Sequence, residues 1–284
     1  MPDGSQEALP TMKKILVPCD FSDPAIQAFK FASEIASINN GEVFLLNIIE
    51  VPALHNSTAL AYEMEFLKEL KENAGKNFEK MKARWGGEAK AHLLVEHGSV
   101  VSIINKFVET KAIDLVVMGT HGAGGLREFV VGSNTEKIVR SSKVPVIAVK
   151  RASKIASIKD IIFPIHLGLD QKDLITSVKA LQGFLKAKLH ILHINTPVNF
   201  TGDIDTGKKL SEFVKENQFK NCTINIYNDL DTGTGIINFS SRFTNKMVAM
   251  STHGRRGLNH FLSGSIAEDV VNHIECPIWT YAVL

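Results

Sequence analysis

The sequence predicts an α/β fold made of two tandem domains, each with a five-stranded, mainly parallel sheet flanked by helices. Short apolar runs alternate with longer segments of helical spacing, which is the pattern of strands joined by crossover helices. The same order of motifs occurs twice along the chain, which indicates an internal duplication. The 284 residues also suit two domains of about 140 residues each.

The first half of the chain begins with Lys14–Pro18, an apolar run typical of a buried strand. Asp23 and Pro24 predict the start of a helix, with Asp23 as the N-cap and proline at the first helical position. Asn40 and Gly41 predict its end. Further strands are expected at 42–49, 91–96, 113–118 and 144–149, and further helices at 58–84, at 99–110 and from 133 onward.

The second half repeats these motifs in the same order. The matching segments are Lys14–Pro18 with Asp160–Pro164, Val43–Ile48 with Leu189–Ile194, Ile103–Asn105 with Ile236–Asn238, Thr120–Gly122 with Thr252–Gly254, Gly132–Ser133 with Gly264–Ser265, and Val144–Val146 with Cys276–Ile278. The matching prolines are 146 positions apart, whereas His121 and His253 are 132 apart, so the second copy is 14 residues shorter before its loop. The interval from Pro18 to Asn47 equals that from Pro164 to His193, which places the loss in the long-helix region.

These boundaries divide the chain into a flexible N-terminal extension at 1–11, a first domain at 12–150, a linker at 151–158 and a second domain at 159–284. The net charge of +2 is too weak to drive nucleic-acid binding by itself. No apolar run approaches the roughly 18 residues of a membrane helix. Three cysteines are an odd, sparse set that predicts no disulfide framework and favours a reducing cytoplasm.

A glycine-rich loop follows the fourth strand of the first copy. It reads Gly119-Thr-His-Gly122, then nine residues, then Gly132-Ser133, and it enters a helix. Glycines let the backbone approach a phosphate closely and adopt positive φ. The start of the helix adds free N–H groups and the positive end of its dipole. The loop therefore predicts an anion site at the carboxyl edge of the sheet, where ligands of parallel α/β sheets bind.

A second interpretation of the same residues needs no ligand. Ser133 with Glu136, and Ser265 with Glu268, fit the S-x-x-E capping box. Glycines before a capped helix are common in such turns. On spacing alone, the two interpretations stay open.

The chain resembles the universal stress protein family in two copies, from about Lys13 to Val283. ATP-binding members carry Gly-x2-Gly-x9-Gly-(Ser/Thr), and Gly119, Gly122, Gly132 and Ser133 fit this pattern without a gap. The resemblance implies two tandem Rossmann-like (adenine nucleotide alpha hydrolase-like) domains that bind ATP, with Mg²⁺ accompanying the nucleotide.

The resemblance also implies an aspartate near the bound nucleoside, and Asp20 stands at that place after the first strand. It further implies that Pro18, Asn47 and Met118 line the adenosine pocket. Read without the family, Asp20 fits a local Asx turn; together with the matching loop, it is predicted to bind the ribose or the adenine amine.

The second copy departs from the pattern at two places. Ser251 replaces the first glycine and His166 replaces the aspartate, whereas Gly254, Gly264 and Ser265 remain. A side chain where the backbone should approach, and a loss of a carboxylate, predict that one nucleotide binds per chain, in the first copy. His190 and His193 are three residues apart on a strand, which puts them on opposite faces and argues against a shared metal site.

The function expected from the sequence is a nucleotide-binding stress or signalling module with little or no turnover, since no catalytic residue or metal-ligand spacing is evident. The alternatives are a slow ATPase and an interaction scaffold that binds no nucleotide. Apolar edge strands at 144–149 and 277–282 invite pairing, and the family implies that they pair with each other in an internal pseudo-dimer. The sequence leaves a further homodimer open.

Overall fold

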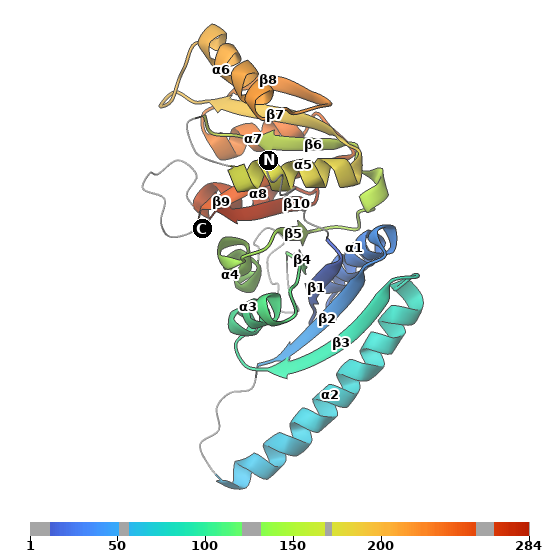
Figure 1. The fold of residues 1–284 in the computed structure, drawn as a ribbon. Helices are drawn as coiled ribbons and strands as arrows, with labels where there is room; N and C mark the ends of the chain where they lie inside the picture. The colour runs from blue at the N-terminus through green and yellow to red at the C-terminus, as the bar shows by residue number, and fades with distance from the viewer. Residues whose placement is uncertain (1–11, 51–56, 121–131, 168–171, 254–263, 284) are drawn as a thin grey trace, which may run out of the picture. The chain divides into compact units, whose positions relative to one another are not determined.

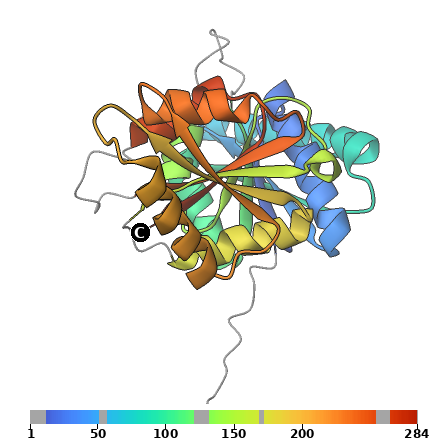
Figure 2. The ribbon, with the colours of Figure 1, turned by 90° about the horizontal axis from the view of Figure 1, so that it is seen from above.

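The structure is a computed structural model that describes residues 12–50, 57–120, 132–167, 172–253 and 264–283 (Figure 1). The chain divides into two compact units, Met12–Ser153 and Lys154–Leu284. The predicted N-terminal extension at 1–11 lies outside the described residues. Each unit is an α/β sandwich with helices on both faces of its strands (Figure 2).

The first unit contains a parallel sheet in the order β3-β2-β1-β4-β5. Its elements are β1 (Lys14–Pro18), α1 (Asp23–Asn39), β2 (Glu42–Ile49), α2 (Ser57–Trp85), β3 (Lys90–His97), α3 (Val100–Thr110), β4 (Leu115–Gly119), α4 (Ser133–Ser141) and β5 (Val146–Val149). Helices α1 and α2 contact each other, as do α3 and α4. A core of fully buried side chains, including Leu16, Leu46 and Ile138, lies between the sheet and α3 with α4.

The second unit repeats this order as β10-β9-β6-β7-β8, again with parallel neighbours. After a short 3-10 turn (Ile155–Ser157), its elements are β6 (Asp160–Pro164), α5 (Lys172–Leu185), β7 (Lys188–Asn195), α6 (Asp203–Glu216), β8 (Cys222–Asn228), α7 (Thr232–Ser240), β9 (Lys246–His253), α8 (Gly264–His273) and β10 (Ile278–Val283). The predicted fold of two five-stranded parallel α/β domains is confirmed.

Equivalent residues of the two copies make equivalent backbone hydrogen bonds at the end of the first strand. Cys19 N donates to Leu46 O at 2.9 Å, and Ile165 N donates to Leu192 O at the same distance. These pairs keep the 146-residue offset read from the sequence. The shortening of the second copy is where it was predicted, because α2 has 29 residues and α6 has 14.

The start of α1 differs from the prediction. Ser22, not Asp23, occupies the N-cap position, and Asp23 and Pro24 already lie inside the helix. The cause is the turn before it: Oδ1 of Asp20 accepts hydrogen bonds from the backbone N–H and the hydroxyl of Ser22. Phe21 between them has a φ of 63°, so the chain has turned before the helix begins. The predicted end is confirmed, since Asn40 is a left-handed C-cap with φ 52°.

The predicted capping box of α4 is also wrong. Gly132 is the N-cap, Ser133 is the first helical residue, and the N-cap residue makes no side-chain capping hydrogen bond. Glu136 instead forms an ion pair with Arg140, one turn along, at 2.9 Å. In the second unit α8 begins at Gly264, so Ser265 likewise lies within the helix rather than before it. Ser133 therefore does not supply the side-chain cap that the capping-box interpretation expected.

A buried polar network crosses three strands of the second unit. Nε2 of His190 lies 2.8 Å from Asp160 Oδ1, and its Nδ1 lies 2.8 Å from the Thr223 hydroxyl. The His190 side chain is only 7% exposed. Because both ring nitrogens are used, His190 satisfies its buried polar groups and ties β6, β7 and β8 together.

We expect Asp160→Ala to destabilise the second unit by about 1–3 kcal/mol, since it leaves a buried imidazole nitrogen unpartnered. Hydrogen–deuterium exchange of β7 amides, which reads each unit separately, measures this loss. Glu42→Ala is the matched control, because Glu42 pairs with Nε2 of His92 at 3.0 Å in a far more exposed place and should cost about 0–1 kcal/mol. Equal effects of the two substitutions would contradict the prediction.

Candidate functional site

The carboxyl edge of the first sheet has a point where the strand order reverses. Strand β1 lies between β2 and β4, so the chain winds outward through β2 and β3 and then returns to β4 on the other side. Crevices at such switch points are where open α/β sheets bind ligands. Pro18 ends β1 and Gly119 ends β4, so the sequence-predicted residues meet at this point.

The two ends of the glycine loop are fastened together there. Gly132 N donates to Thr120 O at 2.6 Å, and Thr120 N donates to Val149 O of β5 at 3.2 Å. The Thr135 hydroxyl of α4 donates to Gly119 O at 2.9 Å. These bonds hold the N-terminus of α4 beside the end of β4, with its first N–H groups lacking partners within the helix. Residues 121–131 between them, including Gly122 and His121, lie outside the described residues.

In the structure, the reason why position 119 must be glycine differs from the predicted one. A Cβ at this position would lie 2.6–2.8 Å from the backbone and Cβ of Pro24, and its φ is not in the left-handed region. The close approach that requires glycine is therefore that of α1, whatever else binds nearby. Gly132 also does not use positive φ, since its φ is −60°.

Asp20 and Asn47 both have structural partners at this edge. Asp20 forms the Asx turn with Ser22, which was the alternative interpretation from the sequence, although a carboxylate has room for further donors. The Asn47 amide donates to Cys19 O at 2.8 Å and so ties the end of β2 to the end of β1. Burial raises the pKa of the Cys19 thiol to about 12, which makes it an unreactive neighbour of the site.

The remaining predicted residues differ in depth. Met118 is 5% exposed and belongs to the core beneath α3 and α4. Pro18 is partly buried and Ser133 is exposed. Thr120 and Thr135 fasten the two ends of the loop, and neither was predicted from the sequence as a site residue. Their hydrogen bonds depend on the tertiary approach of β4 and α4, for which loop spacing gives no signal.

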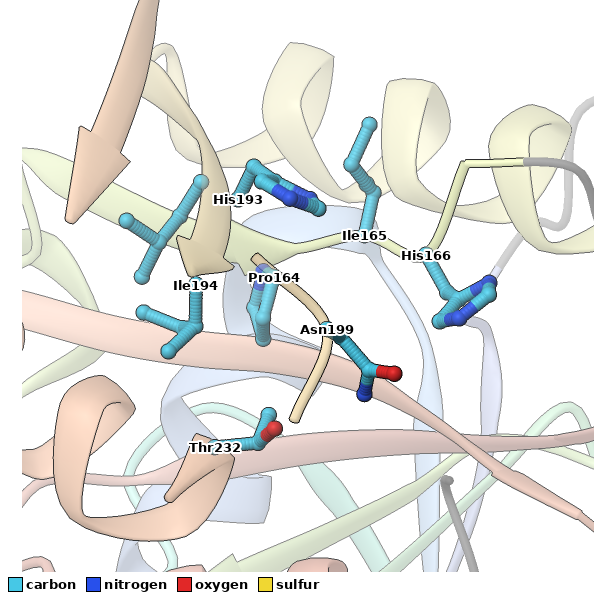
Figure 3. A pocket seen from close by; sticks show the side chains of 8 residues that line it. Pro164, Ile165, His166, His193, Ile194, Asn199 and Thr232 are labelled. Atoms are coloured by element: carbon cyan, nitrogen blue, oxygen red, sulfur yellow. The ribbon is translucent and has the colours of Figure 1, made fainter. Parts of the chain in front are cut away.

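The second unit has a pocket at its matching edge (Figure 3). It is lined by Pro164, Ile165, His166, Leu192, His193, Ile194, Asn199 and Thr232. By the repeat offset, His166 stands where Asp20 stands and His193 where Asn47 stands. Ser251, the counterpart of Gly119, is buried within β9 at 7% exposure.

Comparison with known proteins decides the family. The universal stress protein family matches residues 11–150 and again residues 157–281. The chain belongs to the universal stress protein family. Each of the two repeats therefore matches the family by itself.

Relatives agree with a duplicated chain. Universal stress protein MJ0531 of Methanocaldococcus jannaschii is 35% identical over 145 residues, which is 50% of this chain and 84% of that protein. Universal stress protein MJ0577 of the same organism is 30% identical over 158 residues, or 49% of this chain and 95% of that protein. A crystal structure of a universal stress protein from Archaeoglobus fulgidus matches 95% of this chain and 98% of its own, with a TM-score of 0.71 at 19% identity.

His193 of the second universal stress protein repeat has an unusual environment. Both ring nitrogens are buried, and neither makes a hydrogen bond of good geometry with the described residues. Burial, and to a smaller extent the neighbouring His166, lower the pKa of the imidazole below its ordinary value of 6.5, although Asn195 opposes the shift. The ring is therefore neutral at pH 7.

This shift predicts a pH dependence for the second unit. Below about pH 6.5 the unfolded chain takes up a proton at His193 that the folded unit does not, so stability falls with acidification until the lowered pKa is reached. Thermal unfolding of the chain and of His193→Asn between pH 8 and 5 tests this. As pH falls, the free energy of unfolding should decrease more for the unchanged chain than for the variant. A difference between the two that stays constant with pH would refute the prediction.

The described residues were also searched for a metal site and for a membrane-spanning helix. Within them, no group of three or more His, Cys, Asp or Glu side chains is arranged to hold a metal ion. No helix in the described part of the chain has the length and apolar character needed to cross a bilayer. His190 and His193 have separate surroundings, the strand network and the pocket, as their odd spacing predicted.

Proposed function

We propose that this universal stress protein binds an adenine nucleotide, ATP, in its first unit and serves as a stress-response or signalling module. The observation that carries the proposal is the fastened loop. A Gly-x2-Gly-x9-Gly-Ser segment leaves β4 at the switch point, and the Gly132–Thr120 and Thr135–Gly119 bonds hold the start of α4 at the same edge. Free N–H groups and a positive helix end at a switch point favour phosphate.

Each predicted residue has a defined part in this proposal. The α4 start with Gly132 and Ser133 would bind phosphate oxygens, together with Gly122 of the loop. Asp20 would accept hydrogen bonds from the ribose or the adenine amine. Pro18 and Asn47 would border the nucleoside at the ends of β1 and β2, above the buried Met118. The resemblance to ATP-binding members of the family supports these roles.

Mg²⁺ fits this site only as a companion of the phosphates. A protein cage for a hard cation needs several oxygen ligands, and the described residues gather no such acidic cluster. A nucleotide-bound Mg²⁺ that keeps most of its water needs no such cage. We therefore assign the metal to the nucleotide and name no protein ligand.

The proposal places one nucleotide on each chain. The second unit carries Ser251 and His166 in place of Gly119 and Asp20, so it loses the carboxylate that would contact the nucleoside. Its loop keeps Gly254 and Gly264, and residues 254–263 lie outside the described part. Because the glycine at 119 is explained by its packing against Pro24, the proposed asymmetry rests on the exchange of Asp20 for His166.

The proposal also holds that turnover is slow. Helix-end N–H groups stabilise ground-state phosphates, whereas catalysis needs groups that act more strongly on the transition state. Among the described residues at this edge we assign no general base and no arginine finger. A steady-state ATPase rate near the common enzyme median of about 10 s⁻¹ would favour the enzyme alternative instead.

Native mass spectrometry of the freshly purified chain, followed by calorimetric titration with ATP and Mg²⁺, tests the proposal. The expected results are a mass increment of one adenine nucleotide and a stoichiometry of one. Two nucleotides per chain would overturn the one-site assignment. No binding at all would favour the interaction-scaffold alternative.

Two predictions from the sequence complete this proposal. All three cysteines are free thiols, which agrees with the proposed cytoplasmic location. Pairing of 144–149 with 277–282 in an internal pseudo-dimer stays a prediction, as does a homodimer.

A further inference from the structure

Strand β8 is an edge strand of the second unit. It is the last strand of the order β10-β9-β6-β7-β8, and among the described residues only β7 pairs with it (Figure 1). Leu189 N donates to Asn221 O at the start of this pairing, and Asp229 N donates to Asn195 O at its end, each at 3.0 Å. Both bonds fit one regular parallel ladder between the two strands.

This ladder decides which backbone groups of β8 are already used. In a parallel ladder every second residue of an edge strand turns both its N–H and its C=O toward the neighbouring strand. In β8 these are the odd-numbered residues, because the ladder uses the C=O of Asn221 and the N–H of Asp229. The even-numbered residues therefore direct both of their backbone groups away from β7. These outward residues are Cys222, Ile224, Ile226 and Asn228.

The side chains of β8 do not protect this edge. The strand reads Cys-Thr-Ile-Asn-Ile-Tyr-Asn, without Lys, Arg, His, Asp, Glu or Pro, and Ile224 is 38% exposed. Natural edge strands are usually protected from pairing by charged side chains, above all lysine, or by proline. Strand β3, the corresponding edge strand of the first unit, carries such side chains: Lys90, His92, Glu96 and His97. The unprotected edge of β8 is therefore suited to pair with another strand.

The sequence of β8 is complementary to a second copy of itself. If two β8 strands run antiparallel about a twofold axis at Asn225, Ile224 faces Ile226 of the second copy, and both residues have outward backbone groups. Cys222 faces Asn228 of the second copy in the same way, so every outward N–H and C=O of β8 obtains a partner. The isoleucines of the two strands then form one apolar row, because residues two apart lie on one face. No like charges meet, because β8 carries none.

We propose that two copies of this chain associate by antiparallel pairing of their β8 strands in this register. Each copy uses its whole β8 edge in the pair, so assembly through this surface stops at a dimer. A single pair of short strands gives a small interface, which places the dimer among weak associations with a micromolar dissociation constant. The proposal gives the homodimer that the sequence left open a defined surface. It does not rest on nucleotide binding, because every residue it uses lies in the second repeat.

Sedimentation velocity of the full chain at increasing concentration tests the association, and we expect reversible dimers. Ile224→Lys should weaken dimerisation at least about tenfold, because the two lysines of a dimer would be diagonal neighbours in the apolar row. Ile38→Lys is the matched control, since Ile38 of α1 is also an exposed isoleucine, at 55%, and this variant should dimerise as the unchanged chain does. A chain that stays monomeric at about 100 μM, growth beyond dimers, or equal association of the two variants would overturn the proposal.

A cysteine on the twofold axis tests the register, and it keeps the proposal testable if the lysine variant unfolds. Directly opposite residues of a non-hydrogen-bonded antiparallel pair have Cα atoms about 4.5 Å apart, within the range that a disulfide spans. Asn225→Cys should therefore form a disulfide-linked dimer on mild oxidation. Lys220→Cys, at an exposed position just before the strand, is the control, because its two copies would lie about 30 Å apart in this register. The unchanged chain should also stay unlinked, since Cys222 would lie about 20 Å from its copy. Failure of Asn225→Cys to cross-link, or equal cross-linking of Lys220→Cys, would overturn the proposal.

Discussion

Ser133→Asp should weaken ATP binding by about 30-fold while leaving the first unit folded. Ser133 is the first residue of α4 and is exposed. At this position the helix dipole stabilises a negative side chain, so an aspartate should not unfold the helix. A carboxylate about 4 Å from a phosphate charge costs between about 1 and 4 kcal/mol, depending on the local dielectric. An intermediate cost of about 2 kcal/mol gives this factor. Calorimetric titration with ATP and Mg²⁺ measures it.

Ser265→Asp is the matched control in the second repeat. It introduces the same charge at the corresponding position of α8 and should leave the stoichiometry and affinity unchanged. If the two substitutions weaken binding equally, both units bind nucleotide. If neither does, the start of α4 is not the phosphate site.

Gly119→Val should destabilise the first unit by about 3 kcal/mol or more, whether or not a nucleotide is present. A Cβ there would lie 2.6 Å from the Pro24 carbonyl carbon, well inside van der Waals contact. Since backbone atoms of α1 are the obstacle, the helix must shift as a whole, and overpacking of this kind typically costs about 1–3 kcal/mol and occasionally more. Hydrogen–deuterium exchange of β4 and α1 amides measures the effect.

Ser251→Gly in β9 gives the comparison. This position already holds a side chain, 7% exposed, so shortening it should cost about 1 kcal/mol. If Gly119→Val left the exchange of β4 unchanged, the close approach of Pro24 would not be what requires glycine. Loss of ATP binding by Gly119→Val alone would not identify a phosphate contact, which is why the charge at Ser133 is the sharper test.

Much of the fold was predictable because the repeat supplied an internal check. The strand runs were read twice, and both copies keep the same hydrogen bond at the end of the first strand. The helix starts were less predictable. Asp23 looked like a cap, but Asp20 made the turn two residues earlier. Ser133 and Glu136 fit a capping box, but the Gly132–Thr120 bond fixed the helix start one residue before it.

The sequence predicted which residues lie at the candidate site but not which atoms they contact. The loop glycines were predicted to approach a phosphate, and in the structure α1 occupies the space beside Gly119. Asn47 was predicted to line the nucleoside pocket, and in the structure its amide ties the ends of two strands together. Both contacts arise from packing between elements that are far apart in the sequence, so a linear motif cannot predict them. The burial of both His193 ring nitrogens likewise depends on tertiary packing.

The bond between Gly132 N and Thr120 O also makes the position of α4 independent of the length of the loop. Once a loop is closed at its base, doubling the number of residues inside it adds only about 0.6 kcal/mol of chain entropy. Segments of different length can therefore be exchanged between 121 and 131 while α4 begins at the same place. The base of this loop is thus a graft point, at which new recognition sequences can be joined to an unchanged scaffold.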